Sequence, residues 1–339
     1  APSGYKQTDP TLSQPEGPLP LELAFVLPEQ PCVRAGSFIA RFIDEIQEKF
    51  TNVVRRNSRE RLAIDEALKL CILLVTHMAL TPVAALSGQR YTKDAIRVED
   101  LRTYLSNLYK KDICVFAHQL SERLIALEPR RDVAEANVYN GDFFSNWIER
   151  LKNPSIHHNT FWISRNLTMK IANRFGPIIT AASEQRGAVS REMAFAFAAL
   201  LRFYTPFGGE VRVAEGEDPI FVGRVDNGIN YGPRDIYEQG VYSQGGIYTF
   251  RDGVGFTPRL LAALVPAEGQ QTSIEKVRTI LNEFFRYIRW ELATAAYDLT
   301  DYPHLTENIV HMYHRMLNGV SAIDVLREEV LTSSPIHQT

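Results

Sequence analysis

Three side chains near the C-terminus have the types and spacing of metal ligands. Glu307, His311 and His314 occur within the stretch HLTENIVHMYH. On a helix these positions lie on one face, so a carboxylate and two imidazoles would project together. Such sets hold metal ions in helical proteins when other helices add further ligands. No partner motif of this kind occurs elsewhere in the sequence, so a half-exposed helix face with a Glu–His contact is the competing interpretation.

Four arginines are crowded into the stretch VVRRNSRERL. They are Arg55, Arg56, Arg59 and Arg61. Guanidinium groups at this density can neutralise nucleic-acid phosphates without reading base sequence. The acids Glu60, Asp65 and Glu66 lie close by, so a solvated connection between two helices is the alternative. With a net charge of −3, any contact with RNA is expected to be local.

Familiar enzyme motifs are incomplete in this sequence. Gly253-Val254-Gly255 lacks the third glycine and the preceding strand of a dinucleotide fingerprint. Ser243 lies in GVYSQGG, where Val241 replaces the first glycine of a nucleophile elbow. No phosphate-binding GxxxxGK[ST] loop is found. These patterns predict no catalytic residue and no cofactor, and they favour a protein that is not an enzyme.

The most unusual stretch lies between two helical regions, at residues 203–257. It holds more than half of the chain's 20 glycines, with tyrosines and β-branched residues between them. Glycine permits turns with positive φ, so the stretch predicts irregular loops with some β structure. Tyrosine-rich loops of this length are typical of functional or interface segments. We expect a projection or an inter-subunit contact.

The remaining chain predicts a mainly α protein with an extended arm. Residues 1–36 contain seven of the 18 prolines and an apolar second half, which favours an extended segment lying on its own body or a neighbour. The helical body then occupies residues 37–202 and 258–339, on either side of the Gly/Tyr-rich, partly β insertion. Helices are expected at 58–80, 98–109, 112–127, 142–151, 161–175, 190–204, 258–265, 273–299 and 306–331, the last with a break at Gly319.

One expected helix contains the most apolar run in the chain, from Leu70 to Leu86. His77 lies within it, Pro82 limits the helix, and Lys69 borders it. The run is short and polar for a membrane span, so a buried core helix is predicted, with no membrane partner. The three cysteines, far apart in sequence, predict neither a disulfide framework nor a zinc site.

The order of arm, helical body, central excursion and second helical part resembles the α-helical capsid proteins of small double-stranded RNA viruses such as the partitiviruses. This resemblance implies a structural coat protein that assembles into a large homo-oligomer through the arm and residues 203–257. It also implies a shell enclosing RNA, with a virion and host-cytoplasm location. No functional residue is transferred, because the resemblance concerns the plan of the chain.

Two further functions remain open. An RNA-coating nucleoprotein is a close relative of the capsid interpretation, although the near-neutral charge disfavours it. A soluble helical enzyme is the alternative from another class, with residues 203–257 as a lid and with Glu307, His311 and His314 as metal ligands.

Overall fold

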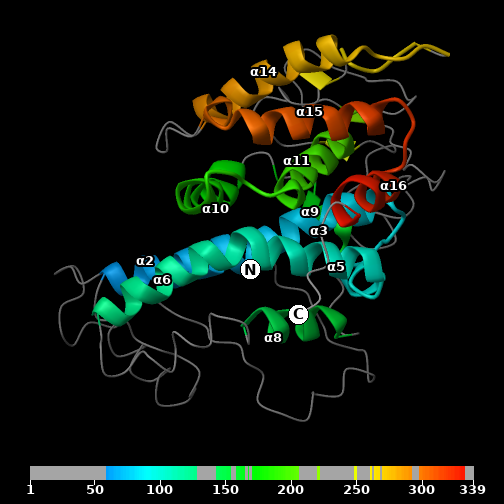
Figure 1. The fold of residues 1–339 in the computed structure, drawn as a ribbon. Helices are drawn as coiled ribbons and strands as arrows, with labels where there is room; N and C mark the ends of the chain where they lie inside the picture. Colours follow the sequence, from blue (N-terminus) through cyan, green and yellow to red (C-terminus); the bar gives the residue numbers. More distant parts are fainter. Residues whose placement is uncertain are drawn as a thin grey trace, which may run out of the picture. The chain divides into compact units, whose positions relative to one another are not determined.

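The chain is mainly α-helical in the part that the structure, a computed structural model, describes (Figure 1). This part comprises residues 59–127, 143–153, 158–164, 167, 170–205, 220–221, 248–249, 260–261, 263–267, 269–291 and 298–332. The predicted arm at 1–36 lies outside it, as does most of the segment 203–257. The chain divides into two units, Ala1–Ala67 and Leu68–Thr339, and the elements from η1 (Lys69–Leu73) onward belong to the second.

Helices of ten to eighteen residues make up most of the described chain. In order, the first elements are α2 (Arg59–Leu68), η1 (Lys69–Leu73), α3 (Leu74–Leu86), α4 (Thr92–Ala95), α5 (Glu99–Leu108), η2 (Tyr109–Ile113), α6 (Cys114–Leu127) and α8 (Phe143–Lys152). They are followed by α9 (Thr160–Ser164), α10 (Ile171–Arg186), α11 (Arg191–Tyr204), α14 (Ile274–Glu291), η5 (Leu299–Asp301), α15 (Pro303–Leu317), α16 (Ala322–Val325) and η6 (Leu326–Leu331).

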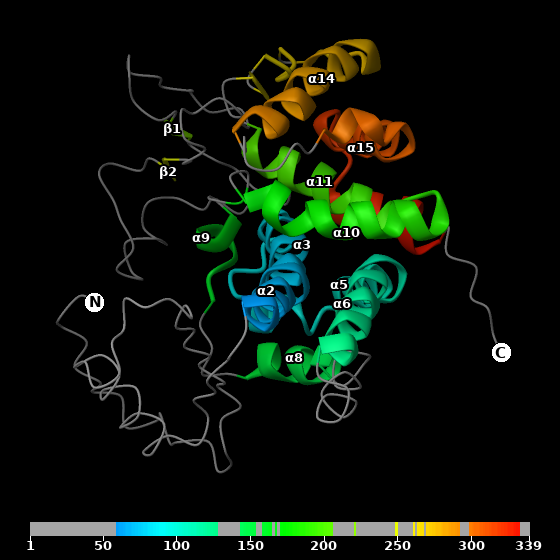
Figure 2. The same cartoon turned by 90° about the vertical axis from the view of Figure 1, so that its left-hand side faces the viewer.

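Helix α11 is the centre of the core. It packs against α3 on one side and α15 on the other, and α14 lies on the far side of α15 (Figures 1 and 2). All of its residues except the first are buried, and its alanines allow the neighbouring helices to approach closely. The Ser190 hydroxyl accepts a hydrogen bond from the Met193 amide and so caps the helix. The helix predicted at 190–204 is confirmed, because α11 follows this cap and runs from Arg191 to Tyr204.

Helix α3 is buried along almost its whole length, as the apolar run predicted. It does not end before Pro82, however, but continues through the proline to Leu86. Proline removes one backbone donor, yet the Thr81 hydroxyl donates to the His77 carbonyl at 2.9 Å in the same turn. Burial of the surrounding apolar side chains outweighs the intrinsic preference of proline to stop a helix.

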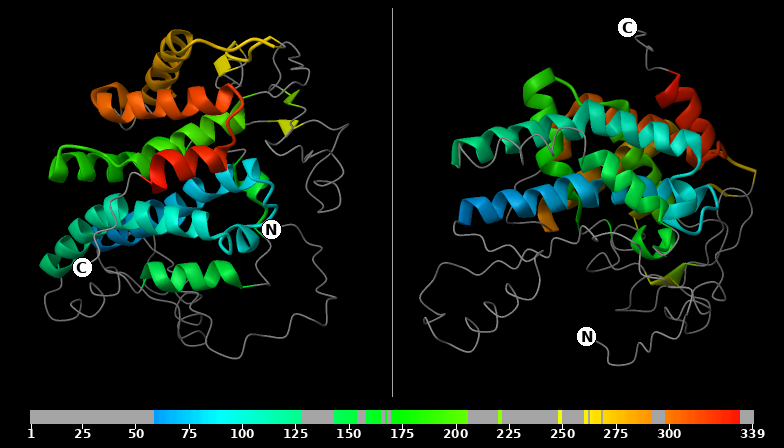
Figure 3. Two further views of the ribbon diagram at one scale, coloured as in Figure 1. Left: turned by 45° about the vertical axis from the view of Figure 1, so that its right-hand side comes forward. Right: turned by 90° about the horizontal axis from the view of Figure 1, so that it is seen from below.

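The helices predicted at 98–109 and 112–127 form a single run. The π-helical turn η2 joins α5 to α6 without a break (Figure 3). Asp112 is therefore not at a helix start but lies fully buried inside the π turn. There it accepts hydrogen bonds from Arg186, the Ser190 hydroxyl and the Ser190 amide, which docks the turn between α10 and α11. Sequence reasoning missed this long-range role.

Two short strands occur in the Gly/Tyr-rich segment. Strand β1 (Ile220–Phe221) pairs with β2 (Tyr248–Thr249) in antiparallel register, with Ile220 opposite Thr249. This pairing agrees with the predicted partly β character. The predicted break at Gly319 is also confirmed, because α15 ends just before this glycine, whose φ is +98°.

Within the described residues, one helix is long and apolar enough to cross a membrane. It runs from Ala63 to Leu86, and 72% of its apolar window is buried inside the structure. Core helices that are mostly buried commonly have this composition.

Candidate active site

The site is built around His77, which lies on α3 and is 9% exposed. Its imidazole meets the indole of Trp147 edge to face, with ring centroids 5.1 Å apart. The imidazole of His158 also meets it edge to face, with ring centroids 5.5 Å apart. Within the part of the chain that the structure describes, the buried Nε2 of His77 has no hydrogen-bond partner. A buried polar atom without a partner is uncommon and indicates a place where a ligand or water binds.

Two other segments hold the rings that surround His77. Trp147 is on the buried side of α8 together with Ile148 and Leu151. The stretch 158–160 is pinned to the loop before α4, because the Thr92 amide donates to the His158 carbonyl and the Thr160 amide donates to the Arg90 carbonyl, both at 3.0 Å. The imidazole of His158 is therefore positioned by backbone hydrogen bonds.

Burial and nearby positive charge keep His77 neutral. Burial lowers its pKa most, and the charges of His158 and Arg150 lower it further, to about 3 from an ordinary value of 6.5. The backbone carbonyl of Leu73 acts in the opposite direction but does not prevail. Near pH 7 the side chain is thus a neutral imidazole, which can hold a hydroxyl group by donating to it or accepting from it.

A lysine lies on the same face of the helix as His77. Lys69 is the first residue of the π-helical turn η1 and is exposed. In an uninterrupted α-helix two turns hold about 7.2 residues, so two residues that are eight apart do not lie directly above one another. A π turn holds about one residue more than an α turn, so eight residues here make about two full turns. The π turn therefore brings Lys69 and His77 into line, roughly 11 Å apart along the axis.

Helix α10 covers another side of the same helical run. The Cys71 thiol donates to the backbone carbonyl of Asn173 at 3.7 Å, which attaches η1 to the first turn of α10. The chain before α10 is held by the buried Tyr204, whose hydroxyl donates to the Ser164 carbonyl and accepts from the Leu167 amide. Lys170 and Arg174, at the start of α10, are consequently fixed near η1.

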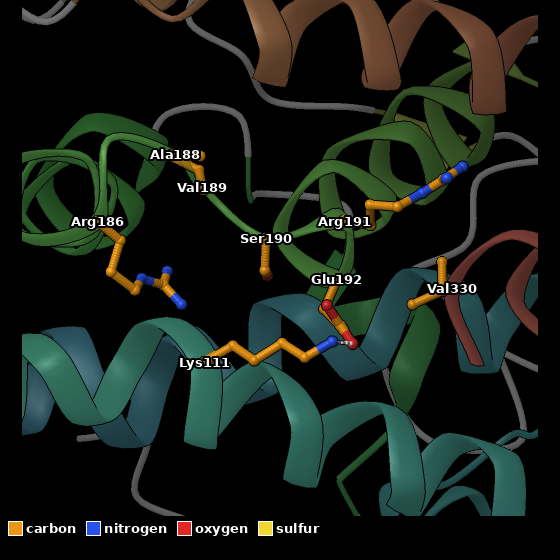
Figure 4. A pocket seen from close by; sticks show the side chains of 8 residues that line it. All are labelled: Lys111, Arg186, Ala188, Val189, Ser190, Arg191, Glu192 and Val330. Atoms are coloured by element: carbon orange, nitrogen blue, oxygen red, sulfur yellow. Dashed lines mark hydrogen bonds and ion pairs between the residues drawn. The ribbon is translucent and has the colours of Figure 1, made fainter. Parts of the chain in front are cut away.

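A second candidate is a cavity of about 390 Å³ beside the turn between α10 and α11 (Figure 4). Its lining residues are Lys111, Arg186, Ala188, Val189, Ser190, Arg191, Glu192 and Val330. The basic groups all have acidic partners. Lys111 pairs with the buried Glu192 at 2.7 Å, Arg186 pairs with Asp112, and Arg191 pairs with Glu329 at 2.9 Å. These pairs join helices, so we interpret the cavity as part of a structural junction.

The predicted metal ligands are not brought together as a site. All three lie on α15, as predicted, but each turns to a different partner. Glu307 pairs with Arg278 at 2.7 Å, and His311 lies 3.1 Å from Glu329. The Nε2 of His314 is hydrogen-bonded to the Thr272 carbonyl and contacts the Asn318 amide nitrogen, both at 2.9 Å. A group of three or more candidate metal ligands is not found among the described residues.

Only part of the arginine cluster lies within the described residues, and there Arg61 lacks the exposure that phosphate binding would need. Arg55 and Arg56 lie outside the described residues, and Arg59 begins α2. Arg61 is only 2% exposed, and its Nε lies 3.4 Å from Asp65 on the next turn. A buried, paired guanidinium is not available to a polyanion.

Comparison with known proteins identifies the family. Residues 61–230, half of the chain, match the family described as the mannitol dehydrogenase C-terminal domain. The chain belongs to this family. The matched segment includes Lys69, His77 and Trp147, so the surroundings of His77 fall within it.

Two altronate oxidoreductases are similar to the chain. The one from Bacillus subtilis (strain 168) is 29% identical over 136 residues, covering 40% of this chain and 25% of that protein. The one from Cronobacter sakazakii is 30% identical over 141 residues, covering 41% of this chain and 26% of that protein. The chain therefore spans about a quarter of the length of the curated relatives it matches.

A solved structure of a mannitol dehydrogenase has a related fold. It is Pseudomonas fluorescens mannitol 2-dehydrogenase in a ternary complex with NAD and D-mannitol. The two chains align with a TM-score of 0.52 and 13% sequence identity, over 83% of this chain and 43% of that one. At this identity the likeness concerns the fold alone.

The capsid interpretation is therefore wrong. It depended on the plan of the chain, and a helical body with an arm and a central excursion does not distinguish a coat protein from a helical dehydrogenase domain. The predictions of no enzyme activity, RNA packaging, a large homo-oligomer and a virion location depended on the same plan and are wrong with it. The alternative of a helical enzyme agrees with the family.

Proposed function

We propose that this chain is the helical, substrate-binding part of an oxidoreductase acting on a linear polyhydroxylated compound, a polyol or its sugar acid. The observation that carries the proposal is the buried Nε2 of the neutral His77, which has no hydrogen-bond partner among the described residues and lies inside the family segment. Helix geometry places the exposed Lys69 of η1 on the same face. The names of the relatives, mannitol 2-dehydrogenase and altronate oxidoreductase, supply the substrate class.

The proposed roles follow from the chemistry of alcohol oxidation. Converting an alcohol to a carbonyl group removes the hydroxyl proton, so the site needs one group to hold the hydroxyl and another to accept its proton. The pKa of about 3 makes His77 a poor proton acceptor but a good neutral hydrogen-bond partner. Lys69 is our candidate for the proton acceptor.

The described residues do not fit a nicotinamide dinucleotide. Such cofactors bind where a parallel strand turns into a helix through a glycine-rich loop. Within the described part, the strands are a single antiparallel pair, and Gly253-Val254-Gly255 lies outside this part. We therefore assign no hydride step to residues of this chain, and the proposal concerns the binding of the substrate.

Isothermal titration calorimetry of the purified chain with D-mannitol and with altronate tests the proposal. We expect at least one compound to bind, with an affinity that falls about tenfold in His77→Asn, since one hydrogen bond is worth roughly 1 kcal/mol or more. Asn keeps a polar group but cannot reach the same place. The matched control is His118→Asn, because His118 is exposed on α6. Absence of binding by both compounds, or equal loss in both variants, would contradict the proposal.

A further inference from the structure

The two ring nitrogens of His77 have different surroundings. The buried Nε2 has no hydrogen-bond partner among the described residues. The imidazole also forms a hydrogen bond with the backbone carbonyl of Leu73, one helical turn earlier. Because Nε2 takes no part in this bond, the nitrogen that forms it is Nδ1. A carbonyl oxygen can only accept a hydrogen bond, so Nδ1 is the donor.

The Leu73 carbonyl lies where the π-helical turn η1 meets α3, because Leu73 is the last residue of η1. The hydroxyl of the buried Thr76 donates to the same oxygen at 2.8 Å and to the Ile72 carbonyl at 3.0 Å. These bonds attach the end of the π turn to the first turn of α3. The acceptor that Nδ1 faces is thereby held in place, and π turns occur frequently at functional sites.

The proton on Nδ1 determines what Nε2 can do. A neutral imidazole carries a single ring proton, on one nitrogen or the other. Burial keeps His77 in this neutral form near pH 7, and the positive charge of Arg150 opposes a second proton on the ring. Since the Leu73 carbonyl holds the one proton on Nδ1, Nε2 presents a lone pair and no proton.

We propose that the Leu73 carbonyl fixes the tautomer of His77, so that Nε2 is a hydrogen-bond acceptor and binds only a ligand group that carries a proton. A hydroxyl group meets this requirement, whereas a carbonyl or ether oxygen does not. The inference rests on the proposed function, because it concerns the same site, and it states which kind of group the site takes. Leu73 is a positioning residue, since it acts through His77.

The direction of this hydrogen bond also separates two hydroxyl groups of the ligand. A hydroxyl group has one proton, so the hydroxyl that donates to Nε2 cannot donate to Lys69 at the same time. His77 therefore holds one hydroxyl, and Lys69 takes the proton of another. The substrate needs a hydroxyl group in addition to the one that is oxidised, and oxidation leaves the group at His77 unchanged.

Nitrogen NMR of the chain with labelled histidine, without ligand, tests the tautomer. Couplings between the ring nitrogens and the carbon-bound ring protons distinguish a protonated from an unprotonated nitrogen. At neutral pH we expect a protonated Nδ1 and an unprotonated Nε2 in His77. The control is the exposed His118, whose Nε2 lies 3.5 Å from the Glu122 carboxylate and should be protonated. A protonated Nε2 in His77 overturns the inference and leaves the proposed function standing.

Calorimetry with altered ligands tests what Nε2 binds. Each hydroxyl of altronate or of D-mannitol is replaced in turn by hydrogen or by fluorine, and in D-mannitol both symmetry-related hydroxyls are replaced together. Fluorine accepts a hydrogen bond weakly but cannot donate one. We expect one position at which both replacements weaken binding about tenfold in the wild type and change it by less than about twofold in His77→Asn. If fluorine restores the binding that hydrogen loses, Nε2 is a donor and the inference is overturned.

Lys69→Met tests whether two hydroxyl groups are held. In this variant a different position should lose its effect, whereas the control Lys110→Met, at an exposed lysine of η2, should keep the wild-type pattern. Circular dichroism confirms that each variant folds. If His77→Asn and Lys69→Met cancel the effect of the same position, the assignment of two hydroxyls is wrong. If neither altronate nor D-mannitol binds, the proposed function fails and the ligand assignment with it, while NMR of the free chain still decides the tautomer.

Discussion

The imidazole of His77 meets the indole of Trp147 edge to face, with ring centroids 5.1 Å apart and ring planes at 83°. This contact joins α3 to α8 and shields the imidazole from water. Both rings are buried, yet the His77 Nε2 has no partner in the described part of the chain. The contact thus excludes water from the surroundings of this unpaired nitrogen.

Removing the Trp147 indole is expected to change the titration of His77. In Trp147→Ala, water reaches the imidazole and the burial that lowers its pKa is largely lost, so the pKa of His77 should rise from about 3 toward 6.5. The missing indole should also reduce the free energy of unfolding by about 3 kcal/mol. Histidine proton NMR against pH measures the first effect and urea unfolding the second. The control Trp147→Phe keeps an aromatic ring against the imidazole and should leave the pKa of His77 low. An unchanged pKa of His77 in Trp147→Ala would contradict the shielding role.

The depressed pKa of His77 also predicts how stability depends on pH. The unfolded chain binds a proton at His77 below an ordinary pKa of 6.5, whereas the folded chain does so only near 3. The unfolded state therefore holds more protons between these values, and stability falls as pH decreases through this window. Between pH 7 and pH 4, His77 should account for a loss on the order of 2 to 3 kcal/mol.

Urea unfolding of the wild type and of His77→Gln at several pH values checks this expectation. The variant lacks the titrating group, so its stability should fall less over the same range. Parallel curves for the two proteins would show that His77 does not carry the effect.

Asp112 is expected to be the most sensitive acidic residue in the described helices. It is fully buried and holds Arg186 together with the amide and hydroxyl of Ser190. Asp112→Ala leaves these donors without their acceptor and should lower the free energy of unfolding by about 2 to 4 kcal/mol. The control is Asp94→Ala, because Asp94 lies 3.9 Å from Arg97 with both side chains exposed, and such pairs contribute about 0.5 kcal/mol or less. Equal shifts in the urea midpoint would contradict the docking role of Asp112.

Periodicity and capping in the sequence were sufficient to predict several helices. Ser190 begins α11 and Gly319 follows α15 as expected, because caps and glycines act locally. The π turns η1 and η2 were not predicted, since inserting one residue leaves the apolar pattern nearly unchanged. Asp112 was interpreted as a helix start for this reason.

The candidate site was beyond sequence reasoning because its parts are far apart along the chain. His77 was noted only as a polar residue in an apolar run, and Lys69 only as its border. Arg150 and Arg174 come near His77 through the packing of α8 and α10, which no local pattern encodes. Conversely, Glu307 and His311 share a helix face as predicted, but neighbouring helices offer each a separate partner. The incomplete fingerprint Gly253-Val254-Gly255 did not indicate the family. Such fingerprints belong to a strand that turns into a helix, whereas the described part of this chain is mainly helical.

Binding of a polyhydroxylated ligand against His77 is tested most directly by NMR of the chain with nitrogen-labelled histidine. The Nε2 resonance of His77 should shift when altronate or D-mannitol is added at neutral pH, because a neutral imidazole gains a hydrogen-bond partner. The resonance of the exposed His118 should not shift when ligand is added. A sample without ligand should show no shift of the His77 resonance. If both compounds leave the His77 resonance unmoved at concentrations that saturate the calorimetric signal, the ligand binds elsewhere and the proposed site is wrong.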